Sequence, residues 1–300
     1  MSDAVSVRVP ATTANLGPGY DCLGLALSLH NEVTLALADE FSVEIEGEGA
    51  DVLPRGESHL VLRAAEAAAQ AAGRDLPPVA LTQVNRIPLA RGLGSSSAAI
   101  VGGVVAANEL LGLGLSERRM LDICTEVEGH PDNVAPALLG GLTVCCAVDG
   151  EVLVRRLDVA EGLRCVVAIP DFEVVTEEAR RALPETVPHV DAVFNLCRTG
   201  LVVSALVSGE FELLCEGMRD RLHQPYRTHL VPGLDDVIEA ALGAGAMGVC
   251  LSGSGPTVAA FVVDDGEEIT QAMVNVFAGR GVVACGEVLD LSAAGATCHR

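Results

Sequence analysis

Hydrophobic and polar residues follow two distinct periods in the first half of the chain. Residues 79–84 alternate between apolar and polar side chains, which predicts a strand, and Pro88 ends this pattern. Residues 98–111 are apolar almost without interruption before Asn108, which predicts a buried helix. The same periods predict, over this half, strands near residues 4–9, 31–38, 42–47 and 79–84, and helices near residues 59–72, 98–111 and 116–128.

The second half continues this mixture of strands and helices after a glycine pair, Gly140-Gly141. The chain contains no internal repeat or low-complexity linker, so a domain boundary has to be inferred from topology. We place it near residue 150, which gives domains of residues 1–150 and 151–300. The patterns predict strands at residues 142–148, 152–156, 164–169, 247–251, 257–263 and 282–289, and helices near residues 187–208, 232–243 and 267–279.

The composition indicates a globular protein. A chain of 300 residues, half of them apolar, can bury one large or two ordinary cores. Six Phe, two Tyr and no Trp leave Ala, Val and Leu to fill the core, which is typical of mixed α and β layers. The chain has no uninterrupted apolar run of about eighteen residues, and residues 1–4 contain no basic segment. We therefore expect a cytoplasmic protein that neither spans a membrane nor carries a secretory signal.

The charged residues exclude several classes of partner and of chemistry. Forty-one acidic residues against nineteen basic ones give a net charge of −22, which repels nucleic acids and anionic membranes and makes both improbable partners. Every basic residue is an arginine, so lysine-dependent phosphate loops, protein kinase sites and Schiff-base chemistry are excluded. The ten cysteines have no C-x-x-C spacing, so we expect them to be reduced and buried rather than paired or zinc-bound.

A turn rich in glycine and serine, Gly92-Leu93-Gly94-Ser95-Ser96-Ser97-Ala98-Ala99, joins the strand at 79–84 to the apolar helix. The first turn of a helix leaves backbone N–H groups without acceptors, and the peptide dipoles add partial positive charge there. A phosphate group satisfies both, and the glycines let the backbone approach it closely. The octet therefore predicts an anion cradle, although an isolated turn of this kind more commonly serves only as a helix cap.

Two further segments place polar side chains beside glycines. In residues 10–24, Asn15 can donate to and accept from a substrate hydroxyl, and Asp21 can pair with an ammonium group, whereas the alternative is an irregular loop without a ligand. In residues 126–133, Asp132 or Asn133 is a good N-cap for a helix over residues 134–139.

The acids before that N-cap are candidate metal ligands. The apolar face of the helix at 116–128 is marked by Leu121, Cys124 and Val127. Glu128 falls at the edge of this face, whereas Glu126 points with Arg119 to the polar side. Glu128 is therefore the better candidate for a partly buried metal ligand, and fraying of the helix end would reverse this choice.

Three weaker features lie in the second half. The loop Ser252-Gly253-Ser254-Gly255-Pro256 is, taken alone, an ordinary tight connection between strands. Arg180 and Arg227 have the bidentate fork that suits a carboxylate, although most arginines are solvated surface residues.

Taken together, these loops resemble the three motifs of the GHMP kinases, in the same order. Pro88 to Ala99 is similar to the nucleotide-binding motif of that superfamily. Residues 11–21 and 128–137 resemble the homoserine kinase family in particular, and the likeness extends over nearly the whole chain. Mevalonate kinase-like members use a lysine near the first motif, which this chain lacks. The departures are small: Tyr20 stands where Phe is usual, and Ser97 occupies a small-residue position.

The resemblance implies an α+β, two-domain GHMP kinase fold. Its N-terminal part would be ribosomal-protein-like with a left-handed βαβ crossover, although general statistics favour right-handed crossovers. Its C-terminal part would be ferredoxin-like around a hairpin at residues 247–263, and the family also implies a homodimer.

The resemblance further implies ATP-dependent phosphorylation of the side-chain hydroxyl of L-homoserine. Ser95 and Glu128 would hold Mg²⁺, and Asn133, Asp132 and Asn15 would act at the reacting groups. Asp132 is either a catalytic base or a positioning group, and a loose transition state favours positioning. The nucleotide would contact Pro88, Arg91, Gly92, Leu93, Gly94, Ser95, Ser96, Ser97 and Ala98, and homoserine would contact Asn15, Asp21, His130, Asn133, Arg180 and Arg227.

Two other functions remain compatible with these motifs. A related kinase acting on another small alcohol would keep the cradle but would not need two carboxylate-binding arginines. A non-catalytic nucleotide-binding relative would not need Glu128, Asp132 and Asn133.

Overall fold

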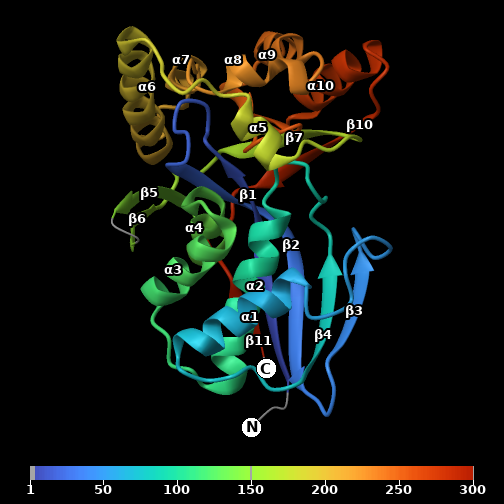
Figure 1. Cartoon of the computed structure of the whole chain (residues 1–300). Helices are drawn as coiled ribbons and strands as arrows, with labels where there is room; N and C mark the ends of the chain where they lie inside the picture. The colour runs from blue at the N-terminus through green and yellow to red at the C-terminus, as the bar shows by residue number, and fades with distance from the viewer. Residues whose placement is uncertain (1–3, 149–150, 300) are drawn as a thin grey trace.

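The computed structural model describes residues 4–148 and 151–299 and contains two sheets, one in each half of the molecule (Figure 1). The larger sheet has the order β11-β1-β2-β4-β3, and β5 pairs with β2 and with β6. Its pairs are antiparallel except for β3 and β4, which are parallel. Its strands are β1 (Ala4–Ala14), β2 (Leu23–Leu37), β3 (Ser42–Gly47), β4 (Val79–Asn85), β5 (Leu142–Val148), β6 (Glu151–Leu157) and β11 (Thr297–His299).

Four helices belong to this half: α1 (Leu60–Ala71), α2 (Ser95–Leu111), α3 (Glu117–Glu128) and α4 (Pro131–Leu139). α2 is buried between α1 and the sheet, and two adjacent glycines allow this close packing. A Cβ atom on Gly102 would lie 2.6 Å from a methyl group of Val33, and one on Gly103 would lie 2.4 Å from the carbonyl oxygen of Val61. The apolar helix that follows the cradle is thus fixed on both sides, which holds its N-terminus in place.

The smaller sheet is antiparallel and has the order β10-β7-β9-β8. Numbered along the chain, this order is the 4-1-3-2 arrangement of a ferredoxin-like βαββαβ unit. Val166 of the sheet shares one apolar core with Val237 and Phe277 from the two helices that cover it, α9 and α10. The strands are β7 (Arg164–Pro170), β8 (Gly248–Leu251), β9 (Val258–Val262) and β10 (Ala284–Asp290), and the helices are α5 (Thr176–Arg181), α6 (His189–Ser208), α7 (Leu214–Gly217), α8 (Gln224–Arg227), α9 (Leu234–Gly243) and α10 (Glu267–Gly279), with single 3-10 turns at Phe211–Leu213 and Thr228–Leu230.

Most predicted elements agree with the structure, and the differences have identifiable causes. β2 begins at Leu23 rather than near residue 31, because the apolar run after the first glycine loop already pairs with β1. α4 begins at Pro131 with His130 as its N-cap, so the prediction that Asp132 or Asn133 caps this helix was wrong. A proline suits the first helical position, where an N–H has no acceptor.

The expected boundary at residue 150 lies outside the described residues, and β5 and β6, which come before and after it in the sequence, pair with each other. Both strands belong to the larger sheet, and β11 joins the same sheet from the far end of the sequence. We therefore propose that the two halves divide between β6 and β7 rather than at residue 150.

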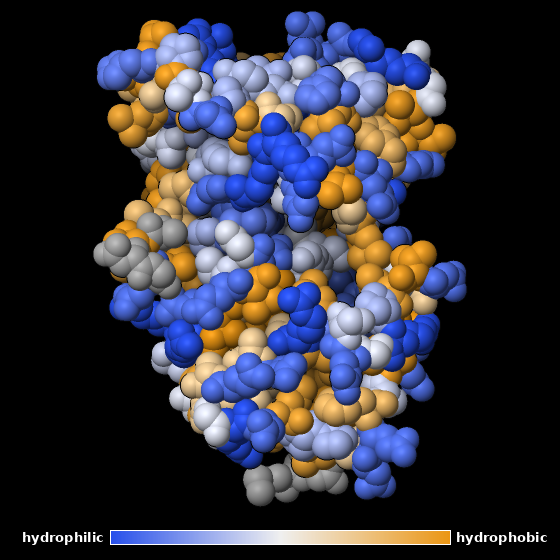
Figure 2. Space-filling model, in the orientation of Figure 1, coloured by the Kyte–Doolittle hydropathy of each residue, from blue (hydrophilic) through white to orange (hydrophobic). Residues whose placement is uncertain are grey.

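Two features differ from expectation: five cysteines are exposed, and α6 is long and apolar. Cys124, Cys145, Cys165 and Cys250 are free and buried, as expected, but Cys146, Cys197, Cys215, Cys285 and Cys298 are exposed rather than buried. α6 is, by length and by a mean hydropathy of 1.5, apolar enough to cross a membrane, although the chain has no uninterrupted apolar run of that length. Its outer face exposes Val190, Val193 and Leu196, and hydrophobic residues are visible there at the upper left of Figure 2.

Candidate active site

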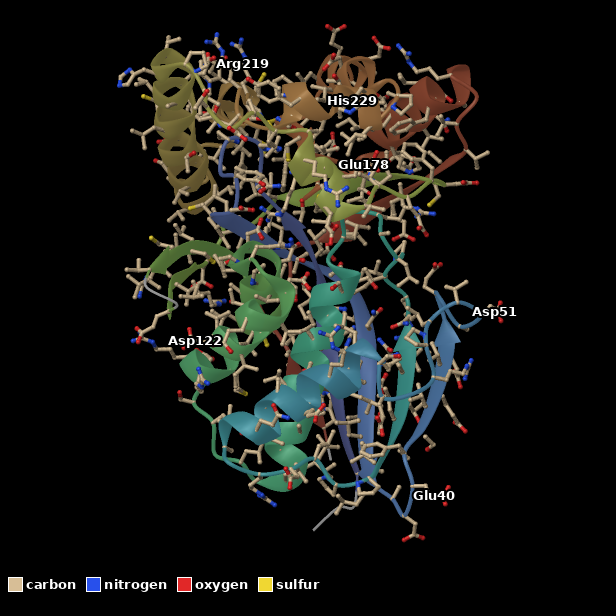
Figure 3. All side chains as sticks on the ribbon, in the orientation of Figure 1. Glu40, Asp51, Asp122, Glu178, Arg219 and His229 are labelled. Carbon is tan, nitrogen blue, oxygen red and sulfur yellow. The ribbon has the colours of Figure 1, made fainter. Side chains whose placement is uncertain are left out.

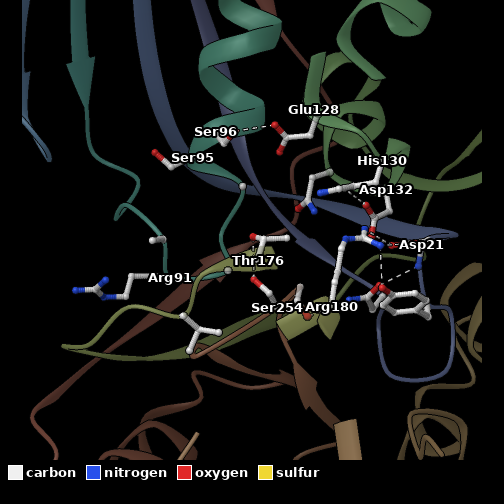
Figure 4. Close-up of a pocket in the computed structure, with 18 of the residues that line it drawn as sticks. Asp21, Arg91, Ser95, Ser96, Glu128, His130, Asp132, Thr176, Arg180 and Ser254 are labelled. Atoms are coloured by element: carbon white, nitrogen blue, oxygen red, sulfur yellow. Dashed lines mark hydrogen bonds and ion pairs between the residues drawn. The ribbon is translucent and has the colours of Figure 1, made fainter. Parts of the chain in front are cut away.

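A polar cavity of about 100 Å³ brings together residues from both halves of the molecule (Figure 4). The exposed acids Glu40 and Asp51 reach outward from the surface of the molecule and are not among the residues that line this cavity (Figure 3). Of the predicted site residues, those that line the cavity are Asn15, Asp21, Arg91, Gly92, Gly94, Ser95, Ser96, Glu128, His130, Asp132, Asn133, Arg180 and Arg227, whereas Pro88, Leu93, Ser97 and Ala98 do not. The side chains of Leu93 and Ala98 are fully buried in the core, so only their backbone can face a ligand.

The cradle at the start of α2 has the backbone conformation that the glycines predict. Gly92 and Gly94 have φ values of 76° and 72°, in the left-handed region. A Cβ atom on Gly92 would lie 2.3 Å from the carbonyl oxygen of Ser252. Gly94 is the N-cap of α2, and no side chain caps the helix. The serines therefore do not serve as caps, and the N–H groups of the first turn are left for a ligand.

Glu128 lies directly beside this helix terminus. Its Oε2 accepts a hydrogen bond of 2.7 Å from the Ser96 hydroxyl, and its Oε1 accepts one of 2.7 Å from Ser97. Glu126 has a side chain that is 62% exposed and lies 3.8 Å from Arg119 in an ion pair at the surface. The end of α3 is therefore not frayed in the way that would exchange the two acids, and of the two it is Glu128 that lines the cavity.

The side-chain amide of Asn15 connects the loop after β1 to the backbone of the second half of the chain. Its Nδ2 donates to the carbonyl oxygen of Gly253 at 3.0 Å, and its Oδ1 accepts from the backbone N–H of Asp21 at 3.0 Å. Asn15 and Asp21 both have positive φ values, 70° and 54°, which asparagine and aspartate tolerate better than most residues. Each end of this amide makes one bond within the protein, which leaves one N–H and one lone pair of Oδ1 for a ligand.

Arg180 and Asp21 form a bidentate ion pair across the cavity, with N–O distances of 2.9 and 2.7 Å. The hydrogen bonds with Asp21 raise the pKa of Arg180. Arg180 also donates to the hydroxyl of Tyr20 at 2.9 Å, a bond that a phenylalanine at this position would lack. The cavity therefore presents a positive and a negative group side by side, which the separate assignments of these two residues did not predict.

Arg227 is buried, with 2% of its surface exposed, yet it lines the cavity. Its Nε donates to the carbonyl oxygen of Ala179, and its Nη1 donates to that of Gly253 and to Nδ1 of His223. Burial lowers the pKa of His223, so its ring is neutral, accepts at Nδ1 and donates from Nε2 to the carbonyl oxygen of Gly17 at 2.6 Å. The guanidinium group also interacts with the side chain of Tyr20 and lies 5.4 Å from the centroid of its ring.

Asp132 and His130 stand at the N-terminus of α4. Oδ1 of Asp132 lies 2.7 Å from Nδ1 of His130, and the aspartate is only 2% exposed. Burial alone would lower the pKa of His130, but the hydrogen bond and negative charge of Asp132 outweigh burial and raise it. The carboxylate of Asp132 is therefore already engaged by the imidazole, and the helix N-terminus stabilises its charge.

Comparison with known proteins identifies the family to which these residues belong. Residues 59–141 match the GHMP kinases N terminal domain, and residues 202–279 match the GHMP kinases C terminal domain. A homoserine kinase of Desulfitobacterium hafniense is 47% identical over 97% of this chain and 99% of its own length. The chain belongs to the homoserine kinase family. A homoserine kinase of Moorella thermoacetica is 48% identical over 92% of this chain and 93% of its own, and the crystal structure of homoserine kinase from Cytophaga hutchinsonii superimposes with a TM-score of 0.90, at 33% identity, covering 100% of this chain and 98% of that chain.

Membership of the homoserine kinase family confirms the predicted fold class, a two-domain GHMP kinase fold of mixed α and β content. It also makes the protein a kinase, and kinases use ATP. The parallel β3–β4 pair, separated along the chain by α1, is the βαβ unit for which the resemblance implies a left-handed crossover.

Several residues of the cavity were not predicted as site residues. Thr176 and Ser254 line it from the second half, and their hydroxyl oxygens lie 3.4 Å apart. A second, largely apolar cavity of about 240 Å³ adjoins the first and shares Ala90, Ser95 and Ser96 with it. Gln83 and Asn85 of β4 line this second cavity. The sequence could have indicated that both side chains face inward, because the period of a strand places them on the same face as the buried residues at 79 and 81.

Proposed function

We propose that this protein transfers the γ-phosphoryl group of ATP to the side-chain hydroxyl of L-homoserine, giving O-phospho-L-homoserine, in the cytoplasm and as a homodimer. The observation that carries the proposal is that one cavity holds both the cradle at the start of α2 and the Arg180–Asp21 pair. A phosphate suits the cradle, and the zwitterionic amino acid suits a pair of opposite charges. The two cavities lie side by side, so nucleotide and acceptor alcohol would meet at the cradle.

The donor groups at the cradle fit Mg²⁺. Glu128 offers one carboxylate and Ser95 one hydroxyl, and the described residues contain no group of three or more His, Cys, Asp or Glu side chains that could hold a metal alone. Such a sparse oxygen set is what Mg²⁺ uses when phosphate oxygens and water complete its shell. The ion supplies neutralisation of phosphate charge during transfer. The β- and γ-phosphates would lie between Glu128, the serines and the backbone N–H groups of α2.

The amino acid would lie against the other wall. Its carboxylate would bind Arg227 together with Arg180, its ammonium would bind Asp21, and its hydroxyl would face Asn133 and the cradle. With the reacting groups held in line, phosphoryl transfer through a loose transition state needs little base catalysis. Asp132 would then position the substrate through its charge and its bond with His130.

This role of Asp132 gives a testable result. Replacing Asp132 with asparagine, which still hydrogen bonds to His130, should lower kcat by about tenfold, as expected for the loss of one charge-assisted contact. A catalytic base would cost about 10²–10⁴-fold. Asp122→Asn is a matched control, because Asp122 is also buried but does not line the cavity, and it accepts from the backbone N–H of Val152. Steady-state kinetics of both variants decides, and a loss above about 10²-fold for Asp132→Asn alone would make Asp132 the base.

The second cavity would hold the adenine base. Oε1 of Gln83 and Oδ1 of Asn85 are buried there without a hydrogen-bond partner among the described residues. An unpaired buried acceptor is costly, and the exocyclic amine of adenine is a donor that would satisfy one of them.

Replacing Gln83 with methionine, which keeps the shape but removes the acceptor, should therefore raise the KM for ATP by about three- to tenfold and leave the KM for homoserine unchanged. It should also reduce the preference for ATP over GTP. Gln70→Met is the matched control, because Gln70 is exposed on α1, donates to Glu66 and does not line this cavity. Unchanged ATP kinetics in Gln83→Met would remove the base from this cavity.

The proposal as a whole is tested by ADP release from Mg-ATP with a panel of acceptors: L-homoserine, L-serine, mevalonate and galactose. We expect turnover with homoserine alone. Turnover with another alcohol would keep the cradle and overturn the assignment of Asp21, Arg180 and Arg227, and ATP binding without turnover would indicate a non-catalytic relative.

A further inference from the structure

Thr12 connects the phosphate cradle to Asn133 without facing the cavity itself. It lies near the end of β1, its surface exposure is 0%, and it is not among the residues that line the cavity. Its backbone N–H donates to the carbonyl oxygen of Leu93 at 3.1 Å, which ties the strand to the cradle. Its hydroxyl donates to Oδ1 of Asn133 at 2.9 Å.

In the structure this hydroxyl engages the oxygen end of the Asn133 amide, which turns the nitrogen end toward the cavity. An asparagine amide has nearly the same shape when its oxygen and nitrogen exchange places, so its orientation is set by its hydrogen-bond partners. Because the Thr12 hydroxyl donates to Oδ1, the Nδ2 group of Asn133 is the end left to donate into the cavity. An N–H donor suits a phosphate oxygen or the oxygen of an alcohol, whereas an inverted amide would present an acceptor to negative charge.

The cradle is shaped around the same hydroxyl. A Cβ atom on Gly94 would lie only 2.0 Å from Oγ1 of Thr12 and 3.4 Å from Oδ1 of Asn133. The glycine at this position therefore allows three groups to meet: the cradle backbone, the threonine hydroxyl and the amide. The next residue of the strand, Thr13, secures the other end of the cradle, because the Ser252 hydroxyl lies 2.9 Å from Oγ1 of Thr13 and 2.6 Å from the carbonyl oxygen of Gly92.

We propose that Thr12 is a positioning residue for phosphoryl transfer, which holds the Asn133 amide with its N–H group toward the transferred phosphoryl or the acceptor hydroxyl. This inference rests on the proposed function, because it assigns a role within the same site. It predicts that losing the hydroxyl allows the amide to invert and disturbs the alignment of the reacting groups, to which phosphoryl transfer is sensitive.

The test compares Thr12→Val, Thr12→Ser and Thr143→Val. We expect Thr12→Val to lower kcat by about 10- to 100-fold with little change in the KM for either substrate, because a misplacement of reacting groups by about 1 Å costs on this scale. Thr12→Ser keeps the hydroxyl and should restore most of the rate. Thr143 is a matched control, since it is fully buried, does not line the cavity, and donates its hydroxyl to the carbonyl oxygen of Gly24.

A double variant separates positioning from general structural support. If Thr12 acts through Asn133, then Thr12→Val should cause little further loss in an Asn133→Ala background, because the group that it orients is absent. Losses that multiply in the double variant, or equal rates for Thr12→Val and Thr143→Val, would overturn the inference. An inactive wild-type protein would instead overturn the proposed function, so the two failures are distinguishable.

Discussion

Replacing Glu128 with glutamine should lower kcat by about 10²–10³-fold, which is the cost of removing one charged group that faces developing charge in a closed site. The glutamine can still accept a hydrogen bond from Ser96 or Ser97, so we expect the end of α3 to keep its position. The substitution removes the negative charge that would help to hold Mg²⁺ against the phosphates. Kinetics at increasing Mg²⁺ concentration is the measurement, and we expect the variant to need more Mg²⁺ for half-maximal rate.

Glu126→Gln provides the matched control for this result. Glu126 lies two residues earlier on the same helix, and its carboxylate pairs with Arg119 at the surface. Exposed pairs of this kind contribute little to stability, so this variant should retain the wild-type rate and Mg²⁺ dependence. An unaltered rate in Glu128→Gln, or a loss confined to Glu126→Gln, would show that the metal assignment is wrong.

Replacing Arg227 with alanine should raise the KM for homoserine by about 10²-fold and leave the KM for ATP nearly unchanged, because a buried charge-assisted contact is lost only from the amino acid. An equal effect on both substrates would move Arg227 to the nucleotide side. Because Arg227 also holds Ala179, Gly253 and His223, the alanine variant loses internal bonds as well. Arg227→Lys keeps the charge and most of the volume, and it serves as the second variant if the alanine protein unfolds.

A substrate analogue removes the remaining ambiguity. The compound 3-aminopropan-1-ol keeps the ammonium group and the primary alcohol of homoserine but has no carboxylate. If Arg227 binds the carboxylate, the analogue should be a poor substrate for the wild-type protein and should not become poorer in Arg227→Ala. A further large loss with the analogue would show that Arg227 acts on the fold or on another part of the substrate.

Local features of this chain were predictable from sequence, because they depend on short-range patterns. The helix over residues 267–279 and the strand over 42–47 have the predicted bounds, since their periods are complete within one segment. The cradle was predictable for the same reason: glycines and serines before an apolar run describe both its backbone and its chemistry. Glu128 could be preferred over Glu126 because side chains two positions apart on a helix point to different faces.

Features that depend on tertiary contacts were not predictable. Asp21 and Arg180 are 159 positions apart, and nothing near either residue indicates that they pair. Thr12 reads as one more polar residue of a loop, because its role comes from Asn133, 121 positions away. The bonds that the Asn15 amide makes with Asp21 and Gly253 within the protein likewise have no signal in the sequence.

The positive charges that line the cavity come from Arg91, Arg180 and Arg227. A guanidinium group does not deprotonate in proteins, whereas a lysine amine would lose its proton near pH 10. The fixed charge that faces the substrates is therefore constant at alkaline pH. Arginine side chains also do not react with amine-directed reagents and are not modified by lysine acetylation. Acyl-donor metabolites that modify lysine side chains therefore have no target residue in this site.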